Sequence, residues 1–437
     1  MIFSILILVF SAFLVLAACH KGRSVGLPVA FIAALLLVHL PGGLAHMSTQ
    51  NTSSFAYKMT ALGVEIASIG ALFFALGVRL ARRQSRSQSV AGTETNRHFL
   101  LFCLGVGWLL ILIFPLVSTI PSVSAVIAKA APVWIIGAAL GLKAALADRK
   151  LFQIAGWAVA ILAFPAFTLI SIGFIATATV ATLIALAPSL LLIRRLWLAF
   201  LALSVTAAIT LSLFVGYFAN RDEIRASVWG GASLEQRLES VSETVKTLAP
   251  VDLENPEHLL AIEQRLNQNY FVGIAADRLE AGSVDYLYGM SIVDGFLALV
   301  PRAVWPNKPV VSGSGDLVRE ATGLGSQLSD TTSWGVGIVL ELYYNFGWLG
   351  IAFGMLLFGY SLSRLDRYVF AAAAAGDQRR LLPAYLVAIA LIFPEGSFVD
   401  IIGGAGAALL VGLGLATIYH TIAPGTKRRS RYRLRGV

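Results

Sequence analysis

The sequence predicts an all-α polytopic membrane protein with about eleven transmembrane helices and one large loop on the outer side of the membrane. Its residues are 57% hydrophobic and only 13% charged, whereas a soluble domain is about 25% charged. The apolar residues come in runs of roughly 17 to 25, a length that crosses about 30 Å of hydrocarbon. The alternation expected of membrane β-strands is missing, so the runs are predicted to be helices, which satisfy their own backbone hydrogen bonds.

Eleven apolar runs follow one another along the chain. Eight form a predicted N-terminal bundle over residues 1–218, and three lie within residues 338–426. The segment from Leu16 to Cys19 resembles a lipoprotein cleavage box, but basic residues follow this run instead of preceding it, which favours an ordinary first span. The predicted spans cover roughly 2–19, 25–45, 61–78, 98–120, 124–146, 151–169, 173–193, 196–218, 338–362, 381–398 and 402–422.

Basic residues collect at every second junction between these spans and in the tail, residues 427–437. Lys and Arg are retained on the cytoplasmic side during insertion. The pattern therefore predicts a multi-pass protein of the bacterial inner membrane, with a periplasmic N-terminus and a cytoplasmic C-terminus. The junction residues are Lys21 and Arg23, then Arg79, Arg82, Arg83, Arg86 and Arg97, then Lys143, Arg149 and Lys150, then Arg194 and Arg195, and then Arg364, Arg367, Arg379 and Arg380.

One long segment, residues 219–337, contains no clear span and is predicted to be a large periplasmic loop. It holds nine Lys/Arg and sixteen Asp/Glu, so the net charge of +9 reflects topology and does not indicate a nucleic-acid partner. Within the loop, Ser233 to Thr247 and Pro256 to Asn269 are predicted to be surface helices. Tyr286 to Val300 is apolar but too short to cross, which suits a helix at the interface or one dipping back into the bundle.

The signatures of soluble catalysis are missing from the chain. It has no GxxxxGK[ST] phosphate loop, no HExxH and no GxSxG, and its six histidines are scattered. Cys19 and Cys103 lie inside apolar runs and indicate neither a disulfide framework nor a cysteine-based metal site. We therefore expect no cofactor and no metal.

A proline-rich turn in the large loop could carry chemistry. Three prolines within residues 301–309 restrict the backbone and hold Arg302 and Lys308 on either side of Trp305. Two cations fixed beside an aromatic ring suit a lipid pyrophosphate and a sugar. The alternative is an anchor at the membrane interface, where Trp and basic residues are common.

Glu341 and Asn345 are four residues apart and share one helix face near the start of the ninth span. A carboxylate at that depth is costly and needs a partner, for which Arg302 and Arg319 are candidates. Glu341 is therefore either a base or orienting group for a hydroxyl, or one half of a structural ion pair.

Four more charges lie in or near the predicted spans. Glu395 and Asp400 flank a short outer turn, where solvation is the commoner outcome. Glu65 and Lys129 are isolated within spans and could line a cavity, although Lys129 is close enough to the outer end to snorkel.

Three strings of the sequence resemble a known family. They are Tyr288–Ser291, the turn Val300–Pro309, and Glu341–Gly347 followed by Gly350. Together with many spans and one large loop before the last helices, they resemble the Wzy-like oligosaccharide repeat-unit polymerases of O-antigen and exopolysaccharide synthesis. The resemblance implies a metal-independent glycosyltransferase of the GT-C kind, which moves a growing glycan from undecaprenyl pyrophosphate to a hydroxyl of the next lipid-linked repeat unit.

The resemblance also implies roles for individual residues. A cation must stabilise the departing pyrophosphate, and a base would activate the acceptor hydroxyl. We expect Arg302 and Lys308 to serve as the cations and Glu341 as the base, with Asp330 and Glu395 as weaker options. The expected substrate-binding residues are Arg319, Trp305, Tyr344, Asn345, Asp330 and Arg278, with Arg265 in reserve.

Other functions remain open at this point. An O-antigen ligase shares the plan but depends on a periplasmic histidine, and the loop offers only His258. A transporter or flippase of lipid-linked sugars usually shows paired halves, which this chain lacks. A structural scaffold for an envelope complex is the remaining alternative. For a polymerase, the expected partners are the lipid bilayer, the lipid-linked oligosaccharide, a chain-length regulator and a flippase.

Overall fold

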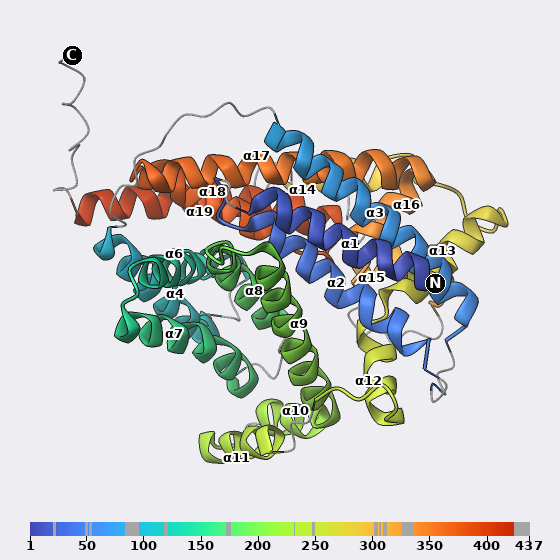
Figure 1. The fold of residues 1–437 in the computed structure, drawn as a ribbon, viewed down its shortest axis with the longest axis horizontal. Coiled ribbons are helices and arrows are strands. Elements are labelled where there is room, and N and C mark those ends of the chain that lie inside the picture. Colours follow the sequence, from blue (N-terminus) through green and yellow to red (C-terminus); the bar gives the residue numbers. More distant parts are fainter. Residues whose placement is uncertain are drawn as a thin grey trace.

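In the computed structural model, helices joined by turns and irregular segments make up the described part of the chain, and no strand occurs in that part (Figure 1). This confirms the predicted all-α class. The predicted basic tail lies outside the described residues. The described residues are 1–20, 23–48, 51, 55–83, 96–117, 121–171, 176–230, 232–246, 250–300, 305, 307–308, 313–325 and 335–423.

Nine helical units within the described ranges are long and apolar enough to cross a membrane, which agrees with the predicted polytopic membrane protein. Most of them coincide with single predicted spans. The units are α1 (Ile2–Cys19), α2 (Leu27–Ala45), α3 (Tyr57–Arg83), α4 (Arg97–Val117), the pair α5 (Pro121–Ala130) and α6 (Val133–Ala147), α7 (Leu151–Ser171), α9 (Leu196–Ala219), the unit of α16 (Ile338–Leu349), η1 (Gly350–Gly354) and α17 (Met355–Ala374), and α19 (Phe398–Ile422).

Two further predicted spans are shorter in the structure. They correspond to α8 (Ala176–Leu190) and α18 (Gln378–Leu391), which have 15 and 14 residues. At about 1.5 Å per residue each helix is only about 21–23 Å long, less than the roughly 30 Å of a hydrocarbon core. Both lie inside the bundle, α8 against α6 and α2, and α18 against α17 and α19. A count of eleven spans therefore stays a prediction.

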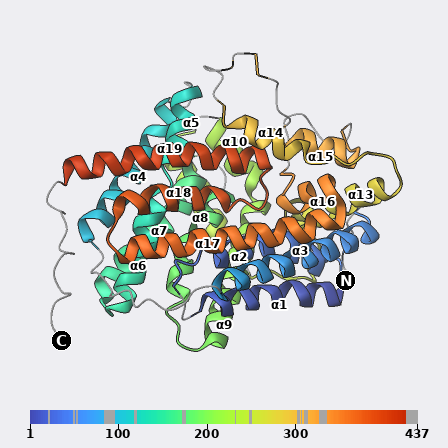
Figure 2. The same cartoon turned by 90° about the horizontal axis from the view of Figure 1, so that it is seen from above.

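Helix α3 packs between α17 and α1 and also contacts α2 (Figure 2). Glycines permit this close approach, because a Cβ atom at Gly77 would lie 2.1 Å from the carbonyl oxygen of Leu356. A Cβ atom at Gly359 would likewise lie 2.2 Å from the carbonyl oxygen of Phe74. Small residues commonly bring membrane helices together in this way.

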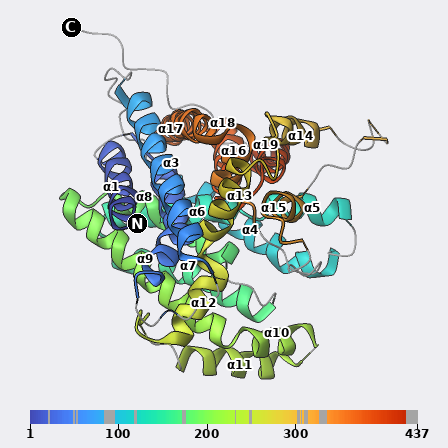
Figure 3. The ribbon, with the colours of Figure 1, turned by 90° about the vertical axis from the view of Figure 1, so that its right-hand side faces the viewer.

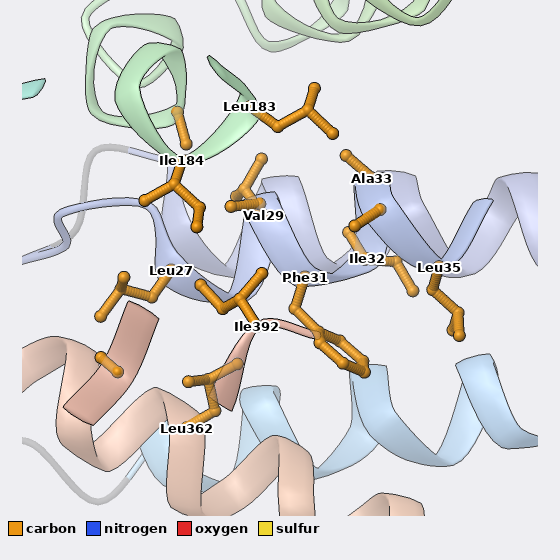
Figure 4. Close-up of a cluster of buried hydrophobic side chains, with 14 of the residues drawn as sticks. Leu27, Val29, Phe31, Ile32, Ala33, Leu35, Leu183, Ile184, Leu362 and Ile392 are labelled. Carbon is orange, nitrogen blue, oxygen red and sulfur yellow. The ribbon is translucent and has the colours of Figure 1, made fainter. Parts of the chain in front are cut away.

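Apolar side chains fill the space between the helices. Figure 4 shows Phe31 and Ile32 of α2 between Leu183 and Ile184 of α8 on one side and Leu362 of α17 on the other. All these residues are buried. The same packing places the short helix α8 in the interior of the bundle.

The large loop folds into six short helices in its described part. Helix α12 begins as predicted, because the side chain of Asn255 accepts a hydrogen bond from the amide of Glu257 at 2.9 Å. Its apolar face packs against α2 and α9, while α10 and α11 lie at the edge of the molecule (Figure 3). The six helices are α10 (Arg221–Trp229), α11 (Leu234–Lys246), α12 (Pro256–Leu266), α13 (Gln268–Glu280), α14 (Met290–Ala298) and α15 (Ser314–Thr322).

Two loop helices join the bundle. Helix α13, which the sequence pattern does not predict, packs along α3 so closely that a Cβ atom at Gly273 would lie 1.8 Å from the carbonyl oxygen of Met59. Helix α14 packs against the first turns of α19, where Gly295 faces Phe398. The helix predicted within Tyr286–Val300 therefore exists and rests on the bundle.

Residues of several basic junctions meet at one end of the molecule around Asp366, which is fully buried. One oxygen of Asp366 accepts hydrogen bonds from the amides of Val25 and Leu27 at 3.1 and 3.0 Å. The other pairs with Arg82 at 2.6 Å. Lys143 donates to the carbonyl of Ser24 nearby. Junctions that the charge pattern assigns to one side of the membrane are thus in contact.

Candidate functional site at the start of α19

The candidate site contains a break in helix α16. Phe346 and Gly347 leave the helical conformation, and Gly347 has φ +58° and ψ −140°, which suits glycine. The break removes intrahelical partners from the carbonyls of Tyr344 and Asn345. These carbonyls accept hydrogen bonds from the amides of Leu287 and Tyr288 at 3.0 and 3.2 Å. A broken helix is therefore stabilised by the segment that precedes α14.

The side chain of Asn345 ties the two segments together. Its oxygen accepts from the amide of Gly289 at 2.8 Å. Its nitrogen donates to the hydroxyl of Ser291 at 2.8 Å and to the carbonyl of Glu341 at 2.7 Å. Two of the strings that resemble polymerases, residues 288–291 and 341–347, are therefore one hydrogen-bonded unit. Asn345 is fully buried, and its contacts give it a positioning role in this structure.

Glu341 is fully buried at the centre of this unit. One of its carboxylate oxygens, Oε2, accepts from the backbone amide of Phe398 at 2.7 Å. Phe398 is the first residue of α19, where a negative charge is favoured by the helix dipole. The other oxygen, Oε1, is buried and has no hydrogen-bond partner among the described residues. The fold thus holds the carboxylate in the interior, with Oε1 enclosed and the side chain of Ser291 beside the group.

The turn between α18 and α19 is attached to the start of α16. The amides of Gly337 and Ile338 donate to the carbonyls of Glu395 and Pro394, both at 3.1 Å. The side chain of Glu395 is half-buried in this turn and lines a cavity. Asp400 is exposed, as expected.

That cavity has a volume of about 410 Å³ and lies between α5, α6, α8, α18 and α19. Three charged residues line it, namely Lys129, Glu395 and Asp400, while the other lining side chains are apolar. Of the two expectations for Lys129, the structure supports the cavity-lining one. Asp400 already accepts hydrogen bonds from the hydroxyls of Ser314 and Ser397 at 2.7 and 2.8 Å. Neither Lys129 nor Glu395 has a side-chain hydrogen bond or ion pair within the described chain.

Helix α19 sets the spacing between Glu341 and the cavity. Glu341 contacts α19 at Phe398, Asp400 follows, and the ammonium of Lys129 lies 3.0 Å from where a Cβ atom at Gly404 would stand. Six residues of helix span about 9 Å. The two contact points on α19, at Phe398 and Gly404, are therefore about 9 Å apart along the helix axis and lie on different faces of the helix.

The predicted cation Lys308 has another role in the structure. Its ammonium donates to the carbonyls of Leu297 and Val300, both at 3.1 Å. These carbonyls end α14, where a cation is favoured by the helix dipole. The opposite end of α14 contacts Asn345 through Ser291. Because α14 has nine residues and is about 13 Å long, Lys308 stands far from Glu341.

Two predicted substrate-binding arginines, Arg319 and Arg278, make their contacts with α15. Arg319 pairs with Asp316 of its own helix at 3.3 Å. Arg278 donates to the carbonyl of Glu320 at 3.3 Å and thereby stabilises the end of the same helix.

Both predicted aromatic residues are described. The ring of Tyr344 is buried, whereas Trp305 is 41% exposed. Arg302 and Asp330 lie outside the described residues. The structure therefore joins Asn345 to Glu341 by a hydrogen bond and places Lys308 elsewhere. The charged groups near the hydroxyl of Tyr344 include those of Glu320 and Arg278.

A comparison with protein-family models adds one match. The model described as "Domain of unknown function (DUF8712)" matches residues 44–408. The chain belongs to the DUF8712 family. The matched region contains Glu341, the broken helix and the cavity of Lys129. Comparisons with curated proteins and with solved structures gave no match.

The DUF8712 chain also contains a buried polar network that sequence reasoning missed. His39 shares a hydrogen bond of 2.8 Å with Asn269, which bonds Asn267 at 3.2 Å. Asn267 donates to Glu263 at 2.8 Å, and Glu263 also contacts His46 at 3.1 Å. The sequence feature that could have indicated this network is the polar string at residues 267–269, which lies at the junction of two helices with apolar faces. The network anchors α12 and α13 to α2.

No metal site emerges from this part of the molecule. Among the residues that the structure describes, no group of three His, Cys, Asp or Glu side chains could hold a metal ion.

Proposed function

We propose that this chain is a membrane polysaccharide polymerase, which transfers a growing glycan from undecaprenyl pyrophosphate to a hydroxyl of the next lipid-linked repeat unit. The proposal rests on the hydrogen bonds that join residues 288–291 to residues 341–347 around Glu341. These strings resemble polymerase sequences and are distant along the chain. Their direct contact is expected if they serve one site.

The chemistry needs a base and a cation. The acceptor hydroxyl attacks the anomeric carbon, the bond from that carbon to the pyrophosphate oxygen breaks, and the hydroxyl proton passes to Oε1 of Glu341. The pyrophosphate leaves with both electrons of the broken bond, and a nearby cation stabilises its growing charge. No cofactor or metal takes part in this scheme.

We further propose eleven spans in a GT-C-like arrangement, with the site on the periplasmic side of the inner membrane. Asp366 and its basic neighbours lie 25 residues beyond Glu341 on the same helical unit, which is about 37 Å if helical throughout. The site is therefore at the opposite end from the basic junctions, which are expected to be cytoplasmic. A His258→Cys variant should react with an impermeant thiol reagent from the periplasm. Reaction only after the membrane is breached would contradict this orientation.

A lipid-linked sugar flippase is the second candidate, because Lys129 and Glu395 line a cavity between helices, as charges in transporters commonly do. A ligase has less support, since the ring of His258 accepts a hydrogen bond from the amide of Asp252 at 3.1 Å and ties it to the start of α12. In either pathway a chain-length regulator and the lipid bilayer would be partners.

The test is a Glu341→Gln variant in cells, with membrane protein levels matched to wild type. A polymerase predicts single repeat units in place of long chains, and these units accumulate on the periplasmic face. Unpolymerised lipid-linked units held on the cytoplasmic face would favour the flippase, and undiminished long polymer would refute the assignment of Glu341.

A further inference from the structure

The cavity between α5 and α19 has an amphiphilic lining. Apolar side chains of α6, α8 and α18 form most of its walls, including Ile135, Ile184 and Ile389. A ligand that fills it must therefore combine an apolar part with a charged or hydrogen-bonding part. A membrane lipid with a polar head group has this chemistry, and the cavity lies between apolar helices, several of them long enough to cross a membrane.

The charged side of the cavity has one available cation. Lys129 makes no hydrogen bond or ion pair within the described residues, and its ammonium lies against α19 at Gly404, where a larger side chain would displace it. A lone ammonium next to apolar walls binds an anion strongly, because little water competes for it.

The two carboxylates do not cancel this cation. Asp400 is occupied by hydrogen bonds from Ser314 and Ser397. Glu395 lines the same cavity but makes no ion pair with Lys129 within the described chain. The ammonium of Lys129 is therefore not neutralised by a carboxylate in direct contact.

We propose that Lys129 is the cation that binds the pyrophosphate of the lipid-linked donor in this cavity. The identity of the lipid rests on the proposed function. A base contacts the incoming hydroxyl on one side of the anomeric carbon, and the cation contacts the phosphate on the other side. Glu341 and Lys129 contact α19 at points about 9 Å apart along its axis, at Phe398 and Gly404. Lys308, which is engaged by two carbonyls of α14, is in a poorer position.

The test measures binding of three probes to the full-length protein in nanodiscs: undecaprenyl pyrophosphate, phosphatidylglycerol and inorganic pyrophosphate. Lys129→Met should weaken undecaprenyl pyrophosphate binding about tenfold or more, the value of one hydrogen bond to a charged group, while Lys129→Arg should retain most of it. Lys150→Met is the matched control, because Lys150 is an exposed partner of Asp148, and it should bind as wild type does.

A second variant protects the test against misfolding. Ala128 lines the cavity from an exposed position, so Ala128→Phe should obstruct the cavity with little effect on the fold and weaken binding as well. Unchanged binding in both Lys129→Met and Ala128→Phe would overturn the proposal. Equal affinity for phosphatidylglycerol or for inorganic pyrophosphate would overturn the assignment to a lipid-linked donor.

The Glu341→Gln variant separates this proposal from the proposed function. Its cavity is intact, so it should still bind undecaprenyl pyrophosphate even though it forms no polymer. If the wild-type protein binds undecaprenyl pyrophosphate in a way that depends on Lys129 but never forms polymer, the proposed binding site is supported and only the proposed reaction is refuted.

Discussion

Asn345→Ala should destabilise the protein measurably, because this buried side chain joins α16 to the segment before α14. It makes three hydrogen bonds of 2.7–2.8 Å, to Gly289, Ser291 and Glu341. Side-chain hydrogen bonds within membrane proteins average about 0.6 kcal/mol each, so their loss costs about 2 kcal/mol. The amide of Gly289 is also left without its partner, which costs about 1–3 kcal/mol. We expect a loss of roughly 3–5 kcal/mol in the free energy of unfolding.

The measurement is the free energy of unfolding in detergent by denaturant titration. Asn255→Ala is the matched control, since that side chain makes one exposed capping bond of 2.9 Å to Glu257 and its loss typically costs about 1 kcal/mol. If Asn345→Ala were no more destabilising than this control, the union of the two segments would not contribute to stability, and our account of the broken helix would be refuted.

Two further predictions concern charged groups. Lys308→Met should lower the free energy of unfolding by about 0.3–1 kcal/mol, because the cation at the end of α14 is lost, with little change in lipid affinity; a tenfold loss of affinity at unchanged stability would favour Lys308 over Lys129 as the phosphate ligand. Asp366→Asn should cost about 3–5 kcal/mol of unfolding free energy by leaving the charge of Arg82 buried, and adding Arg82→Met should recover part of it; no recovery in the double mutant would argue against the pair.

The fold could be predicted from the sequence wherever a signal was local. Apolar runs located most membrane helices because the thickness of the bilayer fixes their length. Asn255 and Pro256 located the start of α12 because capping is a property of neighbouring residues. Helix α13 was not predictable in this way, since what fixes it is its backbone contact with α3, through Gly273 and Met59.

The site was predictable only in part. Glu341 and Asn345 were found because a costly buried carboxylate and its helical neighbour are visible in the sequence. The partner of Glu341 was expected to be an arginine, and the structure supplies the amide of Phe398 instead. Lys308 was expected to be available, but charge patterns do not show which carbonyls a lysine will reach. The relation of Lys129 to Glu395 depends on the packing of α5 against α19 and leaves no trace in sequence spacing.

The most direct test of the central claim is polymer formation by the purified protein in liposomes that contain only a lipid-linked repeat unit. We expect wild-type protein to produce a ladder of glycan lengths and release undecaprenyl pyrophosphate, and the Glu341→Gln variant to leave the single unit unchanged at equal protein. The same ladder from both proteins would contradict the account, and so would the absence of any product longer than one repeat unit from wild-type protein.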